Sequence, residues 1–432
     1  MNVSVFGLLR GDEGKGKIVD YFSNKGFITI RYAGGPNAGH TIYRSDKKIV
    51  LHQIPSGILN GNMCVIGRGC VVDLKKLVNE MLEVQYLIDA DMLDSSKFKH
   101  GIKYNHDVFC KLNQNDLRDI RNYLKLSYGS HLITPEAIKE DIEREDSGKG
   151  NGSTKCGIAP TYRNKYYRNG IRVYDLFQKT LTDILEITGL SKEEFQYLQP
   201  IFADEELLIN QVWNNSPEFD FLFEGAQGTL LDIDSPYYPN VSSSSPGIAG
   251  IISGTGINAN KLMKNFNSIG VAKVYMSSVG VGKFITEIEE DDKNCKLIRD
   301  AGKEYGATTG RPRKVGWLDL PLLKYSIRTS GIKELCITRF DTLAEAMKDT
   351  KEFKVCRYYK NELDHHLEEY ANIWNLDFYT PVYETFKIWE KCSIDDENFR
   401  TFIEFLQKEL DIFDCKLKYL SVGKNKEDII IL

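Results

Sequence analysis

A short apolar segment followed by a glycine-rich loop constrains the fold of this chain more than any other feature. Residues Val3 to Leu8 form a mostly apolar run with β-branched members. Gly11-Asp-Glu-Gly-Lys-Gly-Lys17 follows, and a helical pattern opens at Ile18 to Phe22. A buried strand, a glycine-rich turn and a helix in this order are typical of α/β proteins that bind an anion at the helix N-terminus. The order therefore predicts a phosphate site that resembles a P-loop.

The same loop indicates where a metal ligand must be sought. It matches the Gly-x-x-x-x-Gly-Lys part of a P-loop, but Ile18 stands where a Ser or Thr would bind magnesium. The ligand must then come from another residue, and Asp12 is the carboxylate at hand. The alternative interpretation is a lysine-rich surface turn, which the preceding strand disfavours.

Strands that end in polar, glycine-bearing loops recur along the chain. Asp73 is expected to cap a helix with an apolar stripe at Leu74, Leu77, Val78, Met81 and Leu82. Further strands are expected at Phe27–Tyr32, Phe219–Phe223, Gly270–Met276, Leu335–Thr338 and finally Leu417–Leu420, with a helix around Phe402, Phe405, Leu406 and Leu410. Ligands bind beyond the carboxyl ends of such strands. The pattern predicts an α/β fold with a large, mostly parallel central sheet and flanking helices.

Domain organisation and composition give coarser expectations. No linker is evident, so residues 1–432 are expected to form a single domain, with an irregular excursion at about 87–128. A hydrophobic content of 42% is ordinary for a globular protein, and a net charge of -5 gives no electrostatic reason to expect nucleic acid as a general partner. No segment has the about 20 apolar residues of a membrane-spanning helix. No secretory signal is evident, and the 9 cysteines lack any Cys-x-x-Cys pair, which favours a cytoplasmic protein.

Polar motifs follow several of these strands. Gly34-Gly-Pro-Asn-Ala-Gly-His-Thr41 combines close backbone approach with an imidazole, His40, although a histidine in a loop is usually only solvated. Phe223 to Asp232 places the amide of Gln227 between glycines, and Gly306 to Arg313 sets hydroxyls beside guanidiniums that suit a carboxylate or phosphate. A solvated basic turn is the alternative for Gly306 to Arg313.

The segment Thr338-Arg-Phe-Asp341 follows an apolar strand. An aspartate can accept hydrogen bonds from both N1–H and the 2-amino group of guanine, while a long cationic side chain lies along the base. The segment resembles the Asn/Thr-Lys-x-Asp motif of guanine-binding proteins.

In order and spacing, these motifs resemble those of the adenylosuccinate synthetase family. The resemblance runs from Val3 to Gly423, apart from the irregular stretch after Leu87. It also includes the segments Leu51–Gly57, Gly152–Pro160, Val241–Ser244, Trp317–Asp319 and Ser421–Gly423.

The resemblance implies a GTP-dependent ligase that converts IMP and L-aspartate to adenylosuccinate, GDP and phosphate. Asp12 matches the base that takes the N1 proton of IMP, after which O6 attacks the γ-phosphate of GTP to give 6-phosphoryl-IMP. His40 matches the general acid, and Gln227 is the third catalytic residue that the resemblance implies. The amine of aspartate then displaces the phosphate.

The resemblance also implies the binding residues. Those for IMP are Asp12, Glu13, Gly14, Lys15, Asn37, Ala38, Gly39, His40, Thr154, Arg168, Gln227, Ser242 and Arg311. Those for GTP are Gly11, Asp12, Glu13, Gly14, Lys15, Gly16, Lys17, Gly39, His40, Thr41, Arg313, Arg339, Phe340, Asp341, Ser421, Val422 and Gly423. Those for aspartate are Ala307, Thr308, Thr309, Gly310, Arg311, Pro312 and Arg313. Mg²⁺ would be held by Asp12 and the backbone carbonyl of Gly39, and a homodimer would place Arg168 in its partner's IMP site.

Several positions depart from the family pattern. Leu9-Arg10 replaces the usual Gln-Trp near the purine, and Pro36 replaces a His or Asn. An arginine is replaced by Cys156, a run of arginines is interrupted by Pro312, and a lysine is replaced by Arg339. These changes leave open how aspartate binds and whether IMP or another purine monophosphate is preferred. The alternatives are a sister ligase acting on, for example, dGMP, and a nucleotide-binding paralogue without catalysis.

Overall fold

The computed structural model describes residues 1–44, 47–94, 96–99, 118–148, 150, 152–206, 208–210, 220–279, 282–306, 310, 312–361, 365–367 and 378–432. Contacts divide the chain into two compact units, each made from three stretches. The first comprises Met1–Val5, Gly16–Ala226 and Ser242–Phe266, and the second comprises Phe6–Lys15, Gln227–Val241 and Asn267–Leu432. The single domain stays a prediction. Residues 95 and 100–117 of its expected excursion lie outside the described residues.

Parallel strands form the centre of the first unit. β10 pairs with β2, β2 with β5, β5 with β7 and β7 with β9, all in parallel. Two smaller pairs, β3 with β4 and β6 with β8, lie outside this sheet. The strands are β1 Asn2–Gly7, β2 Ile28–Arg31, β3 His40–Arg44, β4 Lys47–Leu51, β5 Cys64–Ile66, β6 Val71–Val72, β7 Leu124–Ser127, β8 His131–Leu132, β9 Phe202–Ala203 and β10 Phe221–Gly228.

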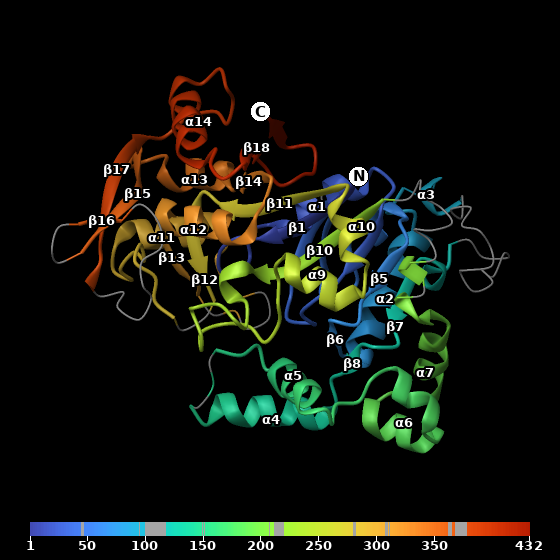
Figure 1. Cartoon of the computed structure of the whole chain (residues 1–432). Helices are drawn as coiled ribbons and strands as arrows, with labels where there is room; N and C mark the ends of the chain where they lie inside the picture. Colours follow the sequence, from blue (N-terminus) through green and yellow to red (C-terminus); the bar gives the residue numbers. More distant parts are fainter. Residues whose placement is uncertain are drawn as a thin grey trace. The chain divides into compact units, whose positions relative to one another are not determined.

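Helices cover these strands and bury their apolar faces. Figure 1 shows α4 beside α5 and α6 beside α7, two helix pairs that pack together. A large core contains side chains of α2 and of strands β5 and β7. The helices are α1 Lys15–Ser23, α2 Leu74–Asp89, α3 Ser96–Lys99, α4 Pro135–Asp146, α5 Ile158–Tyr167, α6 Leu181–Thr188, α7 Lys192–Leu198, α9 Ile248–Thr255 and α10 Ala259–Met263, with a 3₁₀ turn, η1, at Ser56–Asn60.

The second unit contains two groups of strands. β11 pairs with β14 and β14 with β18 in parallel, while β18 and β19 are antiparallel. A separate sheet has the order β12-β13-β15-β16, with β17 also paired to β15. The strands are β11 Phe266–Lys273, β12 Tyr275–Ser278, β13 Lys314–Asp319, β14 Glu334–Thr338, β15 Glu352–Lys360, β16 His366–Leu367, β17 Thr380–Lys387, β18 Lys416–Ser421 and β19 Ile429–Ile431.

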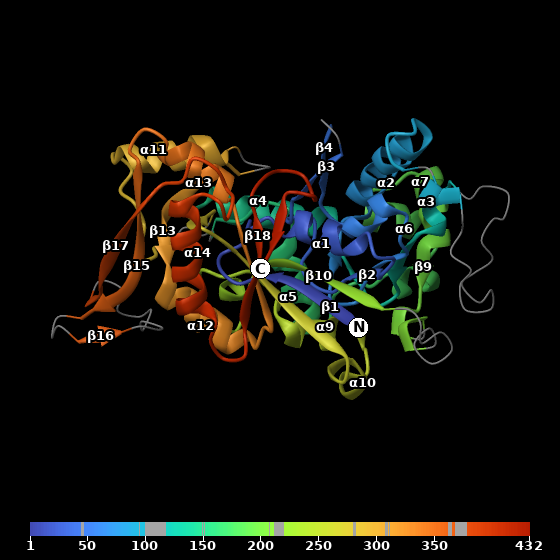
Figure 2. The ribbon, with the colours of Figure 1, turned by 90° about the horizontal axis from the view of Figure 1, so that it is seen from above.

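The helices of the second unit pack against both groups of strands. Figure 2 shows α12 and α14 beside β15 and β17, and α14 also packs against β18. The helices are α11 Lys293–Gly302, α12 Leu320–Ser330, α13 Phe340–Met347 and α14 Glu397–Leu410. The predicted α/β fold with a large, mostly parallel sheet and flanking helices is confirmed.

Three local predictions were wrong in detail. Leu82 is 51% exposed, and the buried stripe of α2 continues through Val84, Leu87 and Ile88 instead. The strand expected at Gly270–Met276 is broken at Val274, because β12 leaves the direction of β11 to pair antiparallel with β13. Leu417–Leu420 is not the last strand, since the chain turns back to form β19.

Candidate functional site

The glycine-rich loop after β1 has the backbone of a phosphate-binding turn. Gly11, Asp12 and Gly14 adopt φ values of 87°, 59° and 86°. Asp12 is the only one of the three with a side chain, and a left-handed backbone at such a residue is a form of strain found at functional sites. The loop leads directly into α1, whose first residue is Lys15. The predicted strand, turn and helix are therefore present in this order.

Glu13 organises this loop from the inside. Its Oε1 accepts hydrogen bonds from the backbone N–H groups of Gly11 (2.8 Å) and Leu9 (3.2 Å). Its Oε2 accepts from Nζ of Lys15 at 2.6 Å, and both side chains are buried. The backbone carbonyl of Glu13 accepts from the hydroxyl of Thr338 at 2.7 Å. The Glu13 side chain thus holds the loop in its conformation from inside, and a ligand would contact the backbone of the loop.

Asp12 is paired with Arg313 at the start of a short chain of charges. Nη2 of Arg313 lies 2.9 Å from Oδ2 of Asp12, and Nη1 donates to Oε2 of Glu304 at 2.8 Å. The other oxygen of Glu304 accepts from Nζ of Lys273 and the hydroxyl of Tyr275, each at 2.6 Å. A residue predicted to bind aspartate and GTP is therefore held against the predicted base.

Burial and positive charge act in opposite directions on Glu304. Burial raises the pKa of this carboxyl. Lys273 and Arg313 together with the hydrogen bonds lower it by a larger amount, so the resulting pKa is about 2. Burial lowers the pKa of Lys273 despite the adjacent carboxylate. Glu304 is thus an ionised anchor that fixes the position of Arg313.

Gln227 lies next to the phosphate loop in the second unit. The hydroxyl of Thr229 donates to the carbonyl of Leu8 at 2.9 Å, and the N–H of Leu230 donates to the carbonyl of Leu9 at 3.3 Å. Gln227 has a φ of 57°, and its Oε1 is buried without a hydrogen-bond partner among the described residues. The structure therefore brings the segment of Gln227 beside that of Asp12, as expected for two residues of one site.

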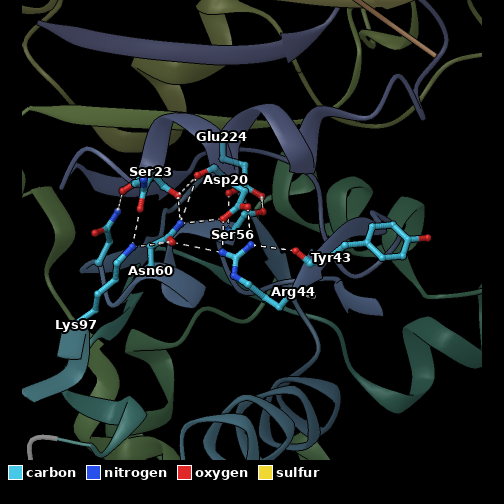
Figure 3. A network of polar contacts seen from close by, with 10 residues as sticks. Asp20, Ser23, Tyr43, Arg44, Ser56, Asn60, Lys97 and Glu224 are labelled. Atoms are coloured by element: carbon cyan, nitrogen blue, oxygen red, sulfur yellow. Dashed lines mark hydrogen bonds and ion pairs between the residues drawn. The ribbon is translucent and has the colours of Figure 1, made fainter. Parts of the chain in front are cut away.

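His40 begins β3 in the first unit and faces Glu224 of β10. Nδ1 of His40 contacts Oε1 of Glu224, and both side chains are buried. The N–H and hydroxyl of Ser56 donate to Glu224 at 2.7 and 2.9 Å (Figure 3). Although burial raises the pKa of Glu224, His40 and these donors hold it below its ordinary value. An ionised carboxylate thus fixes the orientation of the imidazole.

The segment before His40 is held by side chains at the ends of neighbouring strands, Arg31 in β2 and His52 just after β4. Nη2 of Arg31 donates to the carbonyl of Gly35 at 3.0 Å, and Nδ1 of His52 lies 2.7 Å from the carbonyl of Ala38. Oδ1 of Asn37 is buried without a hydrogen-bond partner among the described residues. A Cβ atom added to Gly16, at the start of α1, would lie 2.9 Å from Cβ of His40. His40 thus packs directly against the helix that follows the phosphate loop.

A polar network anchors the same helix one turn further along. Asp20 of α1 forms a two-pronged ion pair with Arg44 of β3, one contact of which measures 2.6 Å. Asn60 donates to Oδ1 of Asp20 at 2.8 Å and to the hydroxyl of Ser23 at 2.7 Å (Figure 3). The network ties α1 to the hairpin that begins at His40. No single motif in the sequence indicates it.

Three further residues predicted for IMP lie in the first unit. Thr154 precedes α5, and Ser242 lies in a serine-rich turn where its hydroxyl is 3.1 Å from that of Ser244. Arg168 ends α5 with a left-handed φ of 66° and is exposed, as are the neighbouring Tyr166 and Tyr167. Arg168 therefore lies on the surface of the first unit.

The residues predicted to read guanine occupy the second unit. Arg339 precedes α13 with a φ of 72°, and Asp341 lies in the first turn of this helix. Asp341 lines a cavity of about 620 Å³ together with Trp389, Cys392 and Asn398. The Phe340 side chain instead packs in the core against Trp389, Phe399 and Phe402. Ser421 ends β18, and Val422 and Gly423 follow it.

Part of the predicted aspartate site cannot be placed. Ala307, Thr308, Thr309 and Arg311 lie outside the described residues. Gly310 has a φ of 64°, Pro312 is bridged to Tyr305, and the N–H of Arg313 donates to the carbonyl of Glu304 at 2.9 Å. The described end of this turn is thus anchored on Glu304.

Two further features of the described residues bear on metal binding and on membrane crossing. The Asp12 carboxylate is 35% exposed, so it offers the hard oxygen ligand that magnesium prefers, usually together with substrate phosphates. Within the described ranges no three His, Cys, Asp or Glu side chains are grouped to hold a metal ion. Nor does any helix in the described part of the chain have the length and apolar character needed to span a membrane.

Glu224, Ser56, Glu304 and Lys273 are the site residues that sequence reasoning missed. Glu224 lies within Phe223 to Asp232, only three residues before Gln227, and Ser56 lies within Leu51–Gly57. Their positions inside these motifs are the signal that could have identified them. Nothing local marks Glu304 or Lys273, because their importance comes from contacts with distant residues.

Comparisons with known proteins show which family the chain resembles over its length. A family model described as adenylosuccinate synthetase matches residues 4–98, 108–194 and 182–430. Adenylosuccinate synthetases of Caldanaerobacter subterraneus and an Exiguobacterium species are 34% and 36% identical to the chain, covering all of it and 99% and 98% of the relatives. The structure of fully ligated adenylosuccinate synthetase from Plasmodium falciparum superposes with a TM-score of 0.79 at 29% identity, covering 100% of this chain and 99% of that one. A cyanophage S-2L succinoaminodeoxyadenylate synthetase, at 14% identity and a TM-score of 0.62 over 100% and 95% of the two chains, shares the fold.

Proposed function

This chain belongs to the adenylosuccinate synthetase family, and from that premise we propose that Asp12, His40 and Gln227 perform the family's reaction. The chain is a GTP-dependent ligase that joins IMP and L-aspartate to give adenylosuccinate, GDP and phosphate. The observation that carries the assignment is the family match over residues 4–98 and 182–430, which include all three residues.

Asp12 acts as the base on N1 of IMP. A carboxylate is a weak base at neutral pH, so it must be held against the proton it takes. The contact with Arg313 supports this role, because the guanidinium fixes one oxygen and leaves Oδ1 for the substrate. As N1 loses its proton, negative charge develops on O6, which then attacks the γ-phosphate of GTP.

Gln227 stabilises the charge that develops on the purine. Its segment lies beside that of Asp12, and its amide oxygen Oε1 is buried and unpaired among the described residues. The NH₂ group of the amide can donate a hydrogen bond to O6. A fixed donor aimed at a developing oxyanion is more effective in a buried site than in water.

His40 acts as a general acid toward the transferring phosphoryl group, and Glu224 is its positioning residue. With Nδ1 directed at Glu224, Nε2 is the nitrogen that can act on a substrate. The two donors from Ser56 keep Glu224 ionised, and the carboxylate in turn stabilises the imidazolium. This is the arrangement by which a carboxylate selects the tautomer of a catalytic histidine.

Mg²⁺ is the proposed cofactor, with Asp12 and the carbonyl of Gly39 as its protein ligands. When bound, it would neutralise charge on the phosphates of GTP. The backbone N–H groups of the loop from Gly11 to Lys17 and the N-terminus of α1 bind the same phosphates. Lys15 would contribute to this site from its position beside Glu13.

GTP selection is assigned to Arg339 and Asp341, and dimer formation to the surface around Arg168. The cavity of about 620 Å³ beside Asp341 supports a nucleobase site. Tyr166 and Tyr167 are 68% and 78% exposed, which suits a surface that a second copy covers. We propose a homodimer in which Arg168 binds the IMP phosphate of its partner.

The test is an assay of the purified chain with a panel of purine monophosphates, with GTP or ATP, and with L-aspartate. Adenylosuccinate formed from IMP and GTP is the expected product. A product formed from dGMP but not from IMP would indicate the sister ligase. No product with any combination, from a folded protein that still binds GTP, would indicate the silent paralogue.

A further inference from the structure

Arg10 is a buried cation for which the family resemblance provides no role. It stands immediately before Gly11 and Asp12, and its side chain is 4% exposed. Nη1 donates a long hydrogen bond of 3.3 Å to the carbonyl of Lys283, and the guanidinium carbon lies 5.6 Å from the centre of the Tyr237 ring. Nε and Nη2 have no hydrogen-bond partner among the described residues.

This arrangement leaves a charge without enough partners among the described residues. A buried N–H group that makes no hydrogen bond is costly, and more so when it carries charge. Burial lowers the pKa of Arg10, while Tyr237 and Glu287 act in the opposite direction. Glu287 is itself engaged by Lys314, with 3.0 Å between Nζ and Oε1. An acceptor from outside the described chain would therefore complete the surroundings of Arg10.

The two unpaired nitrogens define the shape of that acceptor. Nε–H and Nη2–H point in parallel from one edge of the guanidinium plane, which matches two oxygens of a carboxylate or phosphate. Tyr237 supports the plane of the guanidinium through a cation–π contact. A Cβ atom added to Gly282 would lie 2.7 Å from Nη2, so glycine at this position keeps a side chain away from that nitrogen.

We infer that Arg10 binds a carboxylate of the amino-acid substrate, an inference that rests on the proposed function. Arg313, a cation of the predicted aspartate turn, has Nη2 against Asp12 and Nη1 against Glu304. Glu287, whose charge acts on Arg10, is paired with Lys314, the residue directly after Arg313. Glu287 thus relates Arg10 electrostatically to Lys314, at the end of this turn. The phosphates of GTP are assigned to the Gly11–Lys17 loop and the phosphate of IMP to Arg168 of the partner subunit, whereas aspartate carries two carboxylates.

The test compares Arg10→Met and Arg10→Lys with the wild type in steady-state kinetics. We expect Arg10→Met to raise KM for aspartate by about 10- to 100-fold, as for the loss of hydrogen bonds to a charged group. The KM values for IMP and GTP should change less than about threefold. Arg10→Lys keeps the charge over Tyr237 but loses the fork, so its KM for aspartate should rise by at least about fivefold. Lys283→Met, which keeps the backbone carbonyl, is the control and should behave as the wild type.

Two kinetic outcomes would overturn the inference. A rise confined to KM for IMP or GTP would assign a phosphate to Arg10. Unchanged KM values in both variants would make Arg10 a structural cation satisfied by water. Thermal-shift titrations of the wild type and Arg10→Lys with L-aspartate, in the presence of IMP and GDP, test the contact without turnover. If the wild type bound aspartate but made no adenylosuccinate, the proposed function would fail while the Arg10 contact stood.

Discussion

Nη2 of Arg313 lies 2.9 Å from Oδ2 of Asp12, so a cation of the predicted aspartate turn holds the proposed base. Arg313 is fixed from behind by the ionised Glu304. This places the guanidinium between two carboxylates, one buried and one partly exposed. An anionic substrate that engages Arg313 must share it with Asp12. Binding of aspartate and the position of the base are therefore linked through one side chain.

Asp12→Asn should abolish turnover. The amide can neither take the N1 proton nor offer a full charge to magnesium, and loss of a general base alone typically costs about 10²–10⁴-fold. Its carbonyl oxygen can still accept from Arg313, so the fold should be retained. The measurements are kcat and the thermal unfolding midpoint. A folded variant with more than about a tenth of the wild-type rate would contradict the assignment of Asp12.

Glu224→Gln should lower kcat by about 10- to 100-fold, the usual effect of removing a buried partner of a functional histidine. The decline of kcat at high pH should move to lower pH, because the lost negative charge no longer stabilises the imidazolium. Ser56→Ala removes one donor but leaves the carboxylate, and is the matched control with a smaller expected loss. The pH profile separates this role from a purely structural one, which would leave the profile unmoved. A kcat within twofold of that of the wild type would contradict the positioning role of Glu224.

The features predicted from the sequence are those whose cause is local. Gly11 and Gly14 occur where left-handed backbone is required, and their spacing alone is enough to indicate the loop. The cap of α2 was predicted correctly, since Asp73 accepts from the N–H of Lys76 at 3.0 Å. The prediction that Leu82 is buried was wrong, because the spacing of apolar residues along a helix does not determine how wide its buried face is.

Contacts between distant residues were not predictable in the same way. Glu224 and His40 lie 184 positions apart, and no periodicity relates them. Glu13 and Asp12 are adjacent carboxylates in the same loop, yet one turns inward to bind Gly11 and the other faces Arg313. Both orientations depend on the strands that pack around the loop. The family resemblance supplied Asp12, His40 and Arg313, but not Glu224 and Glu304, which hold His40 and Arg313.

Asp341→Asn should raise KM for GTP by about tenfold with less effect on kcat. The amide cannot accept from both N1–H and the 2-amino group of guanine, and the contact is remote from the transferring phosphate. Asp349→Asn, an exposed carboxylate just beyond the end of α13, is the control. A wild-type preference for ATP over GTP would contradict the guanine-binding role of this segment.

Glu304→Gln should destabilise the protein in a way that depends on pH. The pKa of Glu304 falls from its ordinary 4.5 to about 2, so its ionised form stabilises the fold above about pH 4.5. That contribution is lost as the pH falls from 4.5 towards 2. Breaking a buried pair of this kind costs about 3–5 kcal/mol at neutral pH. Thermal unfolding midpoints should therefore differ most at pH 7 and converge near pH 2–3, whereas an equal difference at pH 7 and pH 3 would exclude this origin.

Arg168 should act across a dimer interface. It is exposed at the end of α5, and the family resemblance places the matching arginine on the partner's IMP phosphate. Arg168→Leu and Asp12→Asn should each be inactive alone. A mixed dimer, however, contains one site with both defects and one with neither, so mixing the two variants should restore part of the activity as subunits exchange. Exchange is followed with a fluorescent label on one variant. If the label shows complete exchange and activity stays at the level of the separate variants, Arg168 serves only its own subunit, and the dimer is not required for a complete site.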